Sequence, residues 1–218
     1  MPDLQQKFEM LAGSQFYGVP VKNFEFAGRE QLAYLTAAGL TPHSKVLDIG
    51  CGVLRAGYWL IHFLDAGCYC GIEPHPGRLD LGMNRLLEPQ ILKSKEPRFD
   101  SNASFDTSVF GEKFDFFLAY SIWTHASKRQ IQAMLDGFVR DSNDRAAFLL
   151  TFLPSSWRHP DYRGDQWVGT SHESHLAGTI AHSFGWIKDQ CKERRLSVRK
   201  LNRDKAHRHR WLEIRRTR

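Results

Sequence analysis

The sequence predicts an α/β protein built on a doubly wound, mostly parallel β-sheet. Runs of apolar residues alternate with amphipathic stretches along the chain, which is the pattern of repeated strand–helix–strand units. The segment 114–120 is apolar almost throughout, as expected for a strand buried on both faces of a parallel sheet. Two further strands, 196–201 and 208–215, follow the last helix. We therefore expect a seven-stranded sheet in which one strand is antiparallel.

The first half of the chain supplies three of these strands. Leu54, Tyr58 and Ile61 share one face at helical spacing, which predicts a helix. Pro74 ends the predicted strand 68–73. The predicted elements are helices over 3–12 and 24–38, a strand over 45–49, a helix over 54–64, a strand over 68–73, a helix through 79–86 and a short strand near 98–104.

The second half begins with the apolar strand 114–120. Ser127 and Gln130 form a capping-box pattern that predicts a helix start, and Pro154 ends the next strand. After that helix we expect a strand over 146–153, a long polar and aromatic loop over 155–172, a helix over 175–195 and the two closing strands. Loops of that length are more often functional than incidental.

Composition limits the class of protein. The 218 residues are 42% hydrophobic, which suits one sizeable core. We expect a single compact domain over 41–218, preceded by an N-terminal helical cap over 1–40. No apolar run of about 18 residues marks a membrane span, and no signal-peptide pattern is visible. Four cysteines are too few for a disulfide framework, so we expect a cytoplasmic protein with no membrane partner.

Charge is concentrated at the C-terminus. The net charge is +6, and residues 188–218 hold 13 Lys and Arg against 4 Asp and Glu. A basic face attracts anionic partners such as RNA. No RNA-binding signature accompanies the charge, so a solvated basic surface is the preferred interpretation.

The segment most informative about chemistry is the glycine turn that follows the first strand. Gly50 and Gly52 allow the backbone to adopt positive φ and to approach a ligand closely, at the edge where α/β sheets bind ligands. The dinucleotide motif G-x-G-x-x-G needs a third glycine, and Arg55 stands at that position. A Walker A loop is also absent from the sequence.

Three motifs in order resemble those of the class I S-adenosylmethionine-dependent methyltransferases. They are Asp-Ile-Gly-Cys-Gly at 48–52, Gly-Ile-Glu-Pro at 71–74, and the segment 114–125 that ends in Ser-Ile-Trp-Thr-His. The resemblance covers residues 30–217. It implies a Rossmann-like methyltransferase fold of a small-molecule branch, with S-adenosylmethionine as cofactor.

The resemblance assigns cofactor contacts to six residues: Asp48, Gly50, Cys51, Gly52, Glu73 and Ser121. The acidic residue of the second motif takes the two ribose hydroxyls, and a carboxylate can accept both hydrogen bonds. Glu73 lies 21 residues beyond Gly52, near the spacing of about 20 in one such unit. The third strand has no clear acidic motif, so the adenine contacts stay open among Asn102, Ser104 and Phe105.

His125 is the candidate catalytic residue, because it lies between the fourth strand and the next helix, where donor and acceptor should meet. A histidine there can take a proton from a hydroxyl or an amine. The alternative is a histidine that only hydrogen-bonds the loop backbone. Candidate substrate-binding residues are Tyr120, Trp123, Tyr162 and Trp167, of which Trp123 is equally suited to the core. No metal site is predicted.

We therefore expect methyl transfer from S-adenosylmethionine to a small hydroxylated or amine acceptor such as a metabolite or sugar. One alternative is an RNA methyltransferase that uses the basic C-terminal segment. A second is a catalytically silent binding protein with the same fold, since fold does not fix function. The oligomeric state is not predicted.

Overall fold

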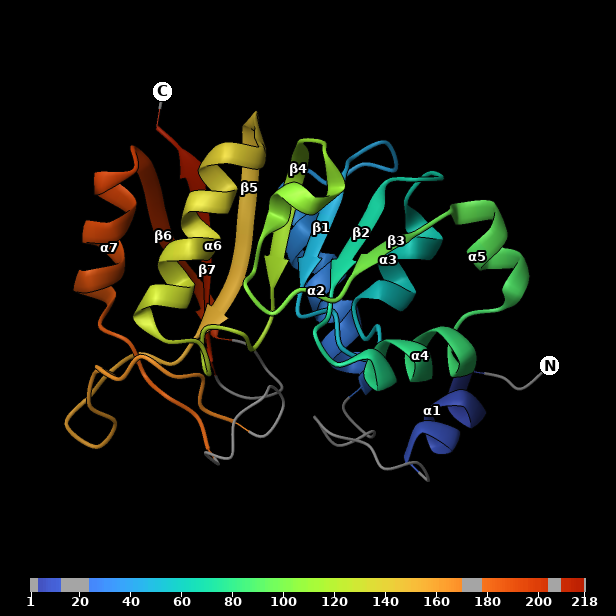
Figure 1. Ribbon diagram of the computed structural model, residues 1–218, viewed down its shortest axis with the longest axis horizontal. Helices are drawn as coiled ribbons and strands as arrows, with labels where there is room; N and C mark the ends of the chain where they lie inside the picture. The colour runs from blue at the N-terminus through green and yellow to red at the C-terminus, as the bar shows by residue number, and fades with distance from the viewer. Residues whose placement is uncertain (1–3, 13–23, 170–177, 204–208, 218) are drawn as a thin grey trace.

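The computed structural model describes residues 4–12, 24–169, 178–203 and 209–217 (Figure 1). In these residues seven strands form one sheet: β1 (Val46–Ile49), β2 (Tyr69–Ile72), β3 (Arg98–Asp100), β4 (Phe114–Ala119), β5 (Ser142–Phe152), β6 (Leu196–Arg203) and β7 (Arg210–Arg216). The helices are α1 (Leu4–Ala12), α2 (Phe24–Ala37), α3 (Gly57–Phe63), α4 (Pro76–Arg85), α5 (Pro89–Lys95), the 3-10 helix η2 (Thr107–Phe110), α6 (Lys128–Asp141) and α7 (Phe184–Glu193).

The strand order is β3-β2-β1-β4-β5-β7-β6. β1 pairs in parallel with both β2 and β4, so that Asp48 lies beside Gly71 on one side and Leu118 on the other. β7 is antiparallel to both β5 and β6. This confirms the predicted doubly wound sheet with one antiparallel strand. The chain reverses its direction of winding between β1 and β4, which is where α/β sheets bind ligands.

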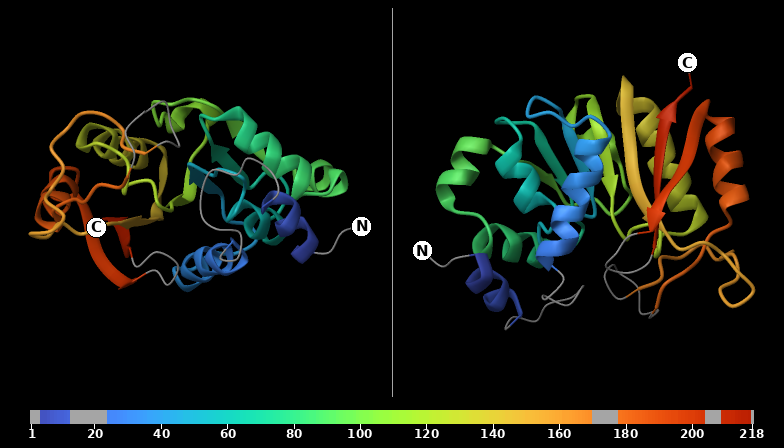
Figure 2. Two further views of the ribbon diagram at one scale, coloured as in Figure 1. Left: turned by 90° about the horizontal axis from the view of Figure 1, so that it is seen from below. Right: turned by 180° about the vertical axis from the view of Figure 1, so that it is seen from behind.

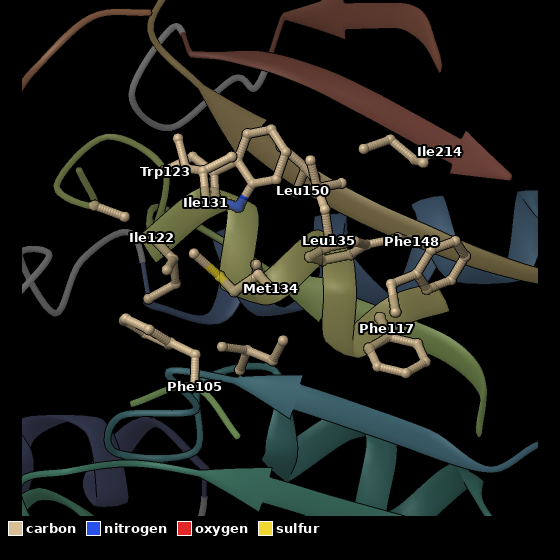
Figure 3. Close-up of a cluster of buried hydrophobic side chains, with 14 of the residues drawn as sticks. Phe105, Phe117, Ile122, Trp123, Ile131, Met134, Leu135, Phe148, Leu150 and Ile214 are labelled. Carbon is tan, nitrogen blue, oxygen red and sulfur yellow. The ribbon is translucent and has the colours of Figure 1, made fainter. Parts of the chain in front are cut away.

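Helices cover both faces of the sheet (Figure 2). On one face, α6 and α7 bury apolar residues such as Met134 and Ile187 in the cluster shown in Figure 3, which also holds Phe117 and Phe148. On the other face, α2 and α3 pack into a second cluster. Among the helices in the described part, none is both long and apolar enough to cross a bilayer.

Helix α2 belongs to the same core as the sheet. Tyr34 stacks on Trp211 of β7, with ring centroids 4.4 Å apart. The Arg215 guanidinium of β7 donates to the carbonyl of Ala38, 3.0 Å away, just beyond the last residue of α2. The N-terminal helix α1 packs on another part of the molecule, because buried Lys7 donates to the Leu86 carbonyl at 2.8 Å.

Several predicted elements are wrong in their bounds. The helix expected from residue 54 begins at Gly57, because Leu54 has a φ of +61° and cannot continue a right-handed helix. The strand expected over 98–104 is limited to Arg98–Asp100. Helix α5 has no counterpart in the prediction.

The helix expected over 175–195 begins only at Phe184, where the Ser183 side chain accepts from the Trp186 N–H. Residues 175–177 lie outside the described part of the chain. The stretch before Ser183 is extended, because Ile180 donates to the Thr124 carbonyl and His182 to the Leu153 carbonyl, both at 2.9 Å. These bonds hold the stretch against neighbouring segments instead of letting it coil.

Candidate functional site

The candidate site lies at the carboxyl edge of the sheet, where β1 and β4 end next to each other (Figure 1). The glycine turn leaves β1 at this edge, and the 120–125 segment leaves β4. The two segments meet directly, because Ile122 packs over Gly50.

The two glycines of the turn have different tasks. Both have left-handed backbones, with φ of +73° at Gly50 and +58° at Gly52. A Cβ on Gly50 would lie 2.1 Å from the Ile122 Cδ1, so this glycine is needed for packing. A Cβ on Gly52 would find no atom nearer than 4.0 Å. The face of Gly52 is therefore open, as a backbone surface that receives a ligand must be.

Glu73 lies at the end of β2, beside that open face. Its carboxylate is buried, and its Oε2 accepts the Gly52 N–H at 3.0 Å. Its Oε1 accepts the His75 N–H, also at 3.0 Å. A carboxylate offers about four lone-pair positions. Two acceptor positions therefore stay available toward a ligand, and the two backbone bonds fix the direction in which they point.

Asp48 lies beneath the turn and is buried in β1. Its Oδ2 accepts the Tyr69 hydroxyl at 2.8 Å. Burial raises the pKa of Asp48 from 3.8 to about 7, while the Tyr69 hydrogen bond and the charge of Arg55 hold it down and Glu73 pushes it up. The Asp48 carboxyl thus changes its protonation near neutral pH. The Arg55 guanidinium also lies over the Tyr120 ring, 5.0 Å from its centre.

Cys51 lies between the two glycines and is buried. Its N–H donates to the Ile72 carbonyl at 3.1 Å, which pins the turn to the end of β2. Burial raises the pKa of the Cys51 thiol well above its ordinary value. A thiol kept protonated in this way is not a nucleophile.

The end of β4 carries Tyr120 and Ser121. Tyr120 is buried, with its ring 5.5 Å from that of Trp211. Ser121 has a φ of +59°, and its N–H donates to the Thr151 hydroxyl at 2.8 Å. This backbone reversal turns the chain away from the sheet edge and carries Ile122 over the glycine turn.

His125 joins the sheet to the loop that follows β5. Its Nδ1 lies 2.6 Å from the Val168 carbonyl, and the Val168 N–H donates back to the His125 carbonyl at 2.9 Å. The imidazole stacks on Trp167, with centroids 5.5 Å apart. Trp167 is buried and stacks in turn near Phe105, with centroids 6.0 Å apart. The rings of His125, Trp167 and Phe105 thus lie in one continuous aromatic stack.

Burial lowers the pKa of His125, against the opposite pull of the Val168 and Gly178 carbonyls. The imidazole is therefore neutral at neutral pH and carries one N–H. When that proton is on Nδ1 and is donated to Val168, the lone pair is on Nε2.

The loop after β5 is anchored at further points. His182 is fully buried, and its Nε2 lies 3.0 Å from the Ala126 carbonyl. Asp161 accepts from Lys128 at 2.5 Å and from the Ser183 N–H at 2.7 Å. These contacts tie the loop to the start of α6 and to the cap of α7.

The structure brings the predicted cofactor residues of the turn together and places Trp167 beside His125. Two predicted acceptor residues lie elsewhere. Trp123 is fully buried and packs edge-on against Phe148 (Figure 3), as its core alternative expects. The Tyr162 hydroxyl donates to the Gln166 carbonyl at 3.1 Å, so this side chain stabilises the loop.

Sequence reasoning missed three residues that shape the site: Ile122, Tyr69 and His182. Tyr69 and Ile122 act through contacts that no spacing rule shows. His182 stands in a stretch for which the sequence predicts a helix. Among the described residues, no group of three or more His, Cys, Asp or Glu side chains is arranged to hold a metal ion.

No protein-family model matches this sequence, and no curated protein matches it. Solved structures do match its fold. Magnesium protoporphyrin IX methyltransferase (ChlM) from Synechocystis PCC 6803 with bound SAH matches with a TM-score of 0.66 and 16% identity, over 97% of this chain and 93% of that one. The DhpI–SAH complex matches with a TM-score of 0.63 and 12% identity, over 96% and 93% of the two chains. The glycopeptide N-methyltransferase MtfA matches with a TM-score of 0.63 and 10% identity, over 88% and 90%. This chain has the Rossmann-like fold of the class I S-adenosylmethionine-dependent methyltransferases.

Proposed function

We propose that this protein binds S-adenosylmethionine at the glycine turn and transfers its methyl group to a small hydroxylated or amine acceptor. The observation that carries the proposal is the pairing of the open face of Gly52 with the Glu73 carboxylate, 3.0 Å from the Gly52 N–H. ChlM and DhpI, whose folds match over nearly the whole chain, were each crystallised with SAH.

The residues present fit this cofactor. Its ribose carries two vicinal hydroxyls, which suit the two acceptor positions left on Glu73. Its backbone-facing surface suits Gly52, where no side chain intervenes. A dinucleotide fits less well, because Arg55 replaces the third glycine and lies over the Tyr120 ring. Asp48, Cys51 and Ser121 complete the proposed cofactor set, Asp48 and Cys51 by holding the turn and Ser121 by setting the end of β4.

The cofactor supplies an electrophilic methyl group on a sulfonium centre. The protein then has to position the acceptor in line and exclude water. Trp167 and Tyr120 are suited to this because both are buried at the edge of the site. His125 is the proposed base for an acceptor whose proton must leave. The tautomer that a base needs has its proton on Nδ1, donated to Val168, and its lone pair on Nε2.

A small acceptor is favoured over RNA because basic side chains near the C-terminus bond to other groups of the protein. Arg194 donates to Asp136 at 2.6 Å, and Arg199 to the buried Glu213 at 2.7 Å. Arg216 donates to the Ser142 hydroxyl at 3.1 Å. These three arginines are engaged within the protein and are to that extent less available to bind phosphates.

The sequence predicts a cap over 1–40 that precedes a catalytic domain over 41–218. Helix α2 supports a modified form of it, since its Tyr34 stacks on Trp211 of the sheet. We propose that α2 is a fixed wall of the domain and that the capping role belongs to the residues before it.

The first test is calorimetric titration of S-adenosylmethionine and SAH into the wild type, Glu73→Ala and Glu73→Gln. We expect binding to weaken by at least about tenfold in both variants, because charge-assisted bonds to the ribose are lost. Glu193→Gln, an exposed carboxylate on α7, is the matched control and should bind as the wild type does. A folded wild type that binds neither compound would refute the cofactor assignment.

The second test is turnover. SAH release is measured with panels of hydroxylated and amine metabolites, and with single-stranded RNA at low and high salt. Release with a small acceptor that is insensitive to salt supports the proposal. Release only with RNA, falling steeply with salt, supports the alternative. Tight cofactor binding with no release on any acceptor supports a catalytically silent protein.

A further inference from the structure

A tight turn in the loop after β5 exposes a tryptophan. Trp157 is 86% exposed, although the other tryptophan of the loop, Trp167, is 7% exposed. The Ser156 N–H donates to the His159 carbonyl at 2.8 Å, and the His159 N–H donates to the Ser156 hydroxyl at 3.2 Å. These two bonds close the turn and place Trp157 and Arg158 at its two central positions.

The turn is held in place by the residues that follow it. Asp161 bonds to both Lys128 and the Ser183 N–H. The Tyr162 N–H donates to the Ala181 carbonyl at 2.9 Å. The contacts of the loop therefore keep the Trp157 indole exposed. Its apolar area stays in water, so this side chain adds no burial free energy to the fold.

The chemistry of the turn is cationic and aromatic. The Arg158 guanidinium lies over the Trp157 ring, 4.5 Å from its centre, and Arg163 is exposed a few residues further on. The charge of Asp161 is balanced by Lys128, so Asp165 is the one carboxylate near the turn without such an ion pair in the described residues.

Among the described residues, no wide apolar surface surrounds Trp157. The other large hydrophobic residues exposed in the described chain are Phe26 on α2 and Val109 on η2, which lie on other elements. A stable protein–protein interface buries a broad, partly apolar patch, and single-stranded nucleic acid is held in a groove. A single aromatic residue on a projecting turn, flanked by arginines, fits neither.

We propose that the Trp157–Arg158 turn docks the protein onto an anionic lipid surface. Tryptophan prefers the membrane–water interface, where its ring is buried and its N–H stays wet. The two arginines complement the negative headgroups of such a leaflet. This departs from the expectation, drawn from the sequence, of no membrane partner. The proposed docking is adsorption to the membrane surface, which needs no membrane-spanning helix.

The turn projects from the end of the molecule where β5 ends, which is also the edge that carries the candidate site (Figure 1). Adsorption through this turn therefore brings that edge toward the bilayer. The docking itself stands independently of the proposed methyl transfer.

The test is co-sedimentation with vesicles of equal parts phosphatidylcholine and phosphatidylglycerol, and with vesicles of phosphatidylcholine alone. We expect the wild type to sediment with the anionic vesicles and to be released by high salt. Trp157→Ala should lower the partition coefficient by about tenfold. Arg158→Gln and Arg163→Gln should each lower it by about fivefold.

Val109→Ala removes another exposed apolar side chain and should partition as the wild type does. Circular dichroism verifies that each variant is folded, and the exposure of these side chains leads us to expect that it is. Equal sedimentation of the wild type and Trp157→Ala would overturn the proposal, as would a wild type that stays in solution. A further outcome would overturn the proposal in favour of nucleic acid: single-stranded RNA releases the protein from the vesicles, and Trp157→Ala weakens the binding of that RNA.

Discussion

The glycine turn and the loop after β5 lie at the same edge of the sheet but are held by different kinds of contact. The turn is fixed across 21 residues of sequence in each of its side-chain bonds, Glu73 to Gly52 and Tyr69 to Asp48. The loop is fixed across 43 residues at His125–Val168 and 56 at His182–Ala126. The first region is one strand–helix–strand unit with a motif, whereas the second depends on distant segments that no local pattern connects.

The largest expected effect is on the turn. Gly50→Ala forces an alanine into a φ of +73° and places its Cβ 2.1 Å from Ile122. The backbone strain costs about 1–2 kcal/mol, and overpacking costs about 1–3 kcal/mol more. We expect urea unfolding to show a loss of about 2–5 kcal/mol, with S-adenosylmethionine binding abolished.

Gly67→Ala is the matched control for that substitution. Gly67 has nearly the same φ, +72°, but a Cβ there meets no atom within 4 Å. It should lose only the strain, about 1–2 kcal/mol, and bind the cofactor normally. Equal losses in the two variants would show that the Ile122 contact does not define the turn.

The second effect tests the loop. Trp167→Ala removes a buried ring between Phe105 and His125, and should cost about 3–5 kcal/mol if the loop is packed as firmly as a core. Trp157→Ala, ten residues earlier, should change the free energy of unfolding by less than about 0.5 kcal/mol. Thermal and urea unfolding measure both. A loss below about 1 kcal/mol for Trp167→Ala would mean that the loop opens independently of the sheet.

How far the sequence predicts the molecule follows from this difference. The succession of strands and helices, the glycine turn and the position of Glu73 were predictable, because each depends on periodicity or on a short motif. The different roles of Gly50 and Gly52 were not predictable, because they depend on Ile122, which contacts the turn from the segment that follows β4. The sequence predicts a helix around His182 because its neighbours are apolar at helical spacing. In the structure this stretch is extended, and the His182 N–H donates to the Leu153 carbonyl.

The two regions should also respond to pH with opposite sign. Burial raises the pKa of Asp48 from 3.8 to about 7, so between these values the folded protein binds a proton that the unfolded chain has released. Stability from this group is therefore present at low pH and is lost as pH rises toward 7. Each pKa unit corresponds to about 1.4 kcal/mol, so the loss is about 2–4 kcal/mol.

Asp48→Asn tests that slope, because asparagine still accepts from the Tyr69 hydroxyl but does not titrate. The difference between the unfolding free energies of the wild type and Asp48→Asn should change by about 2–4 kcal/mol between pH 4 and pH 7, in favour of the variant at the higher pH. Other carboxylates cancel in this difference. A difference that does not vary with pH would show that Asp48 is not buried as a neutral acid.

The smallest effect concerns His182 in the loop. Burial lowers the pKa of His182 below its ordinary value of 6.5, so the unfolded chain binds a proton more readily than the folded one. The stability that it contributes is complete above pH 6.5 and is lost as pH falls through the folded pKa, the reverse of Asp48. His182→Gln keeps a neutral donor toward the Ala126 carbonyl but does not titrate. Between pH 7 and pH 5 this variant should lose less stability than the wild type.

Backbone hydrogen exchange of residues 161–168 is the sharper readout for His182, because opening of the loop precedes global unfolding. Relative to the intrinsic exchange rate at the same pH, these amides should lose protection in acid in the wild type and lose less of it in His182→Gln. His159→Gln, at an exposed position in the same loop, should leave the acid response unchanged. If His159→Gln and His182→Gln behaved alike, the acid response would come from the surface of the loop. The loop and the glycine turn would then differ only in the contacts that hold them, and not in how their buried groups titrate.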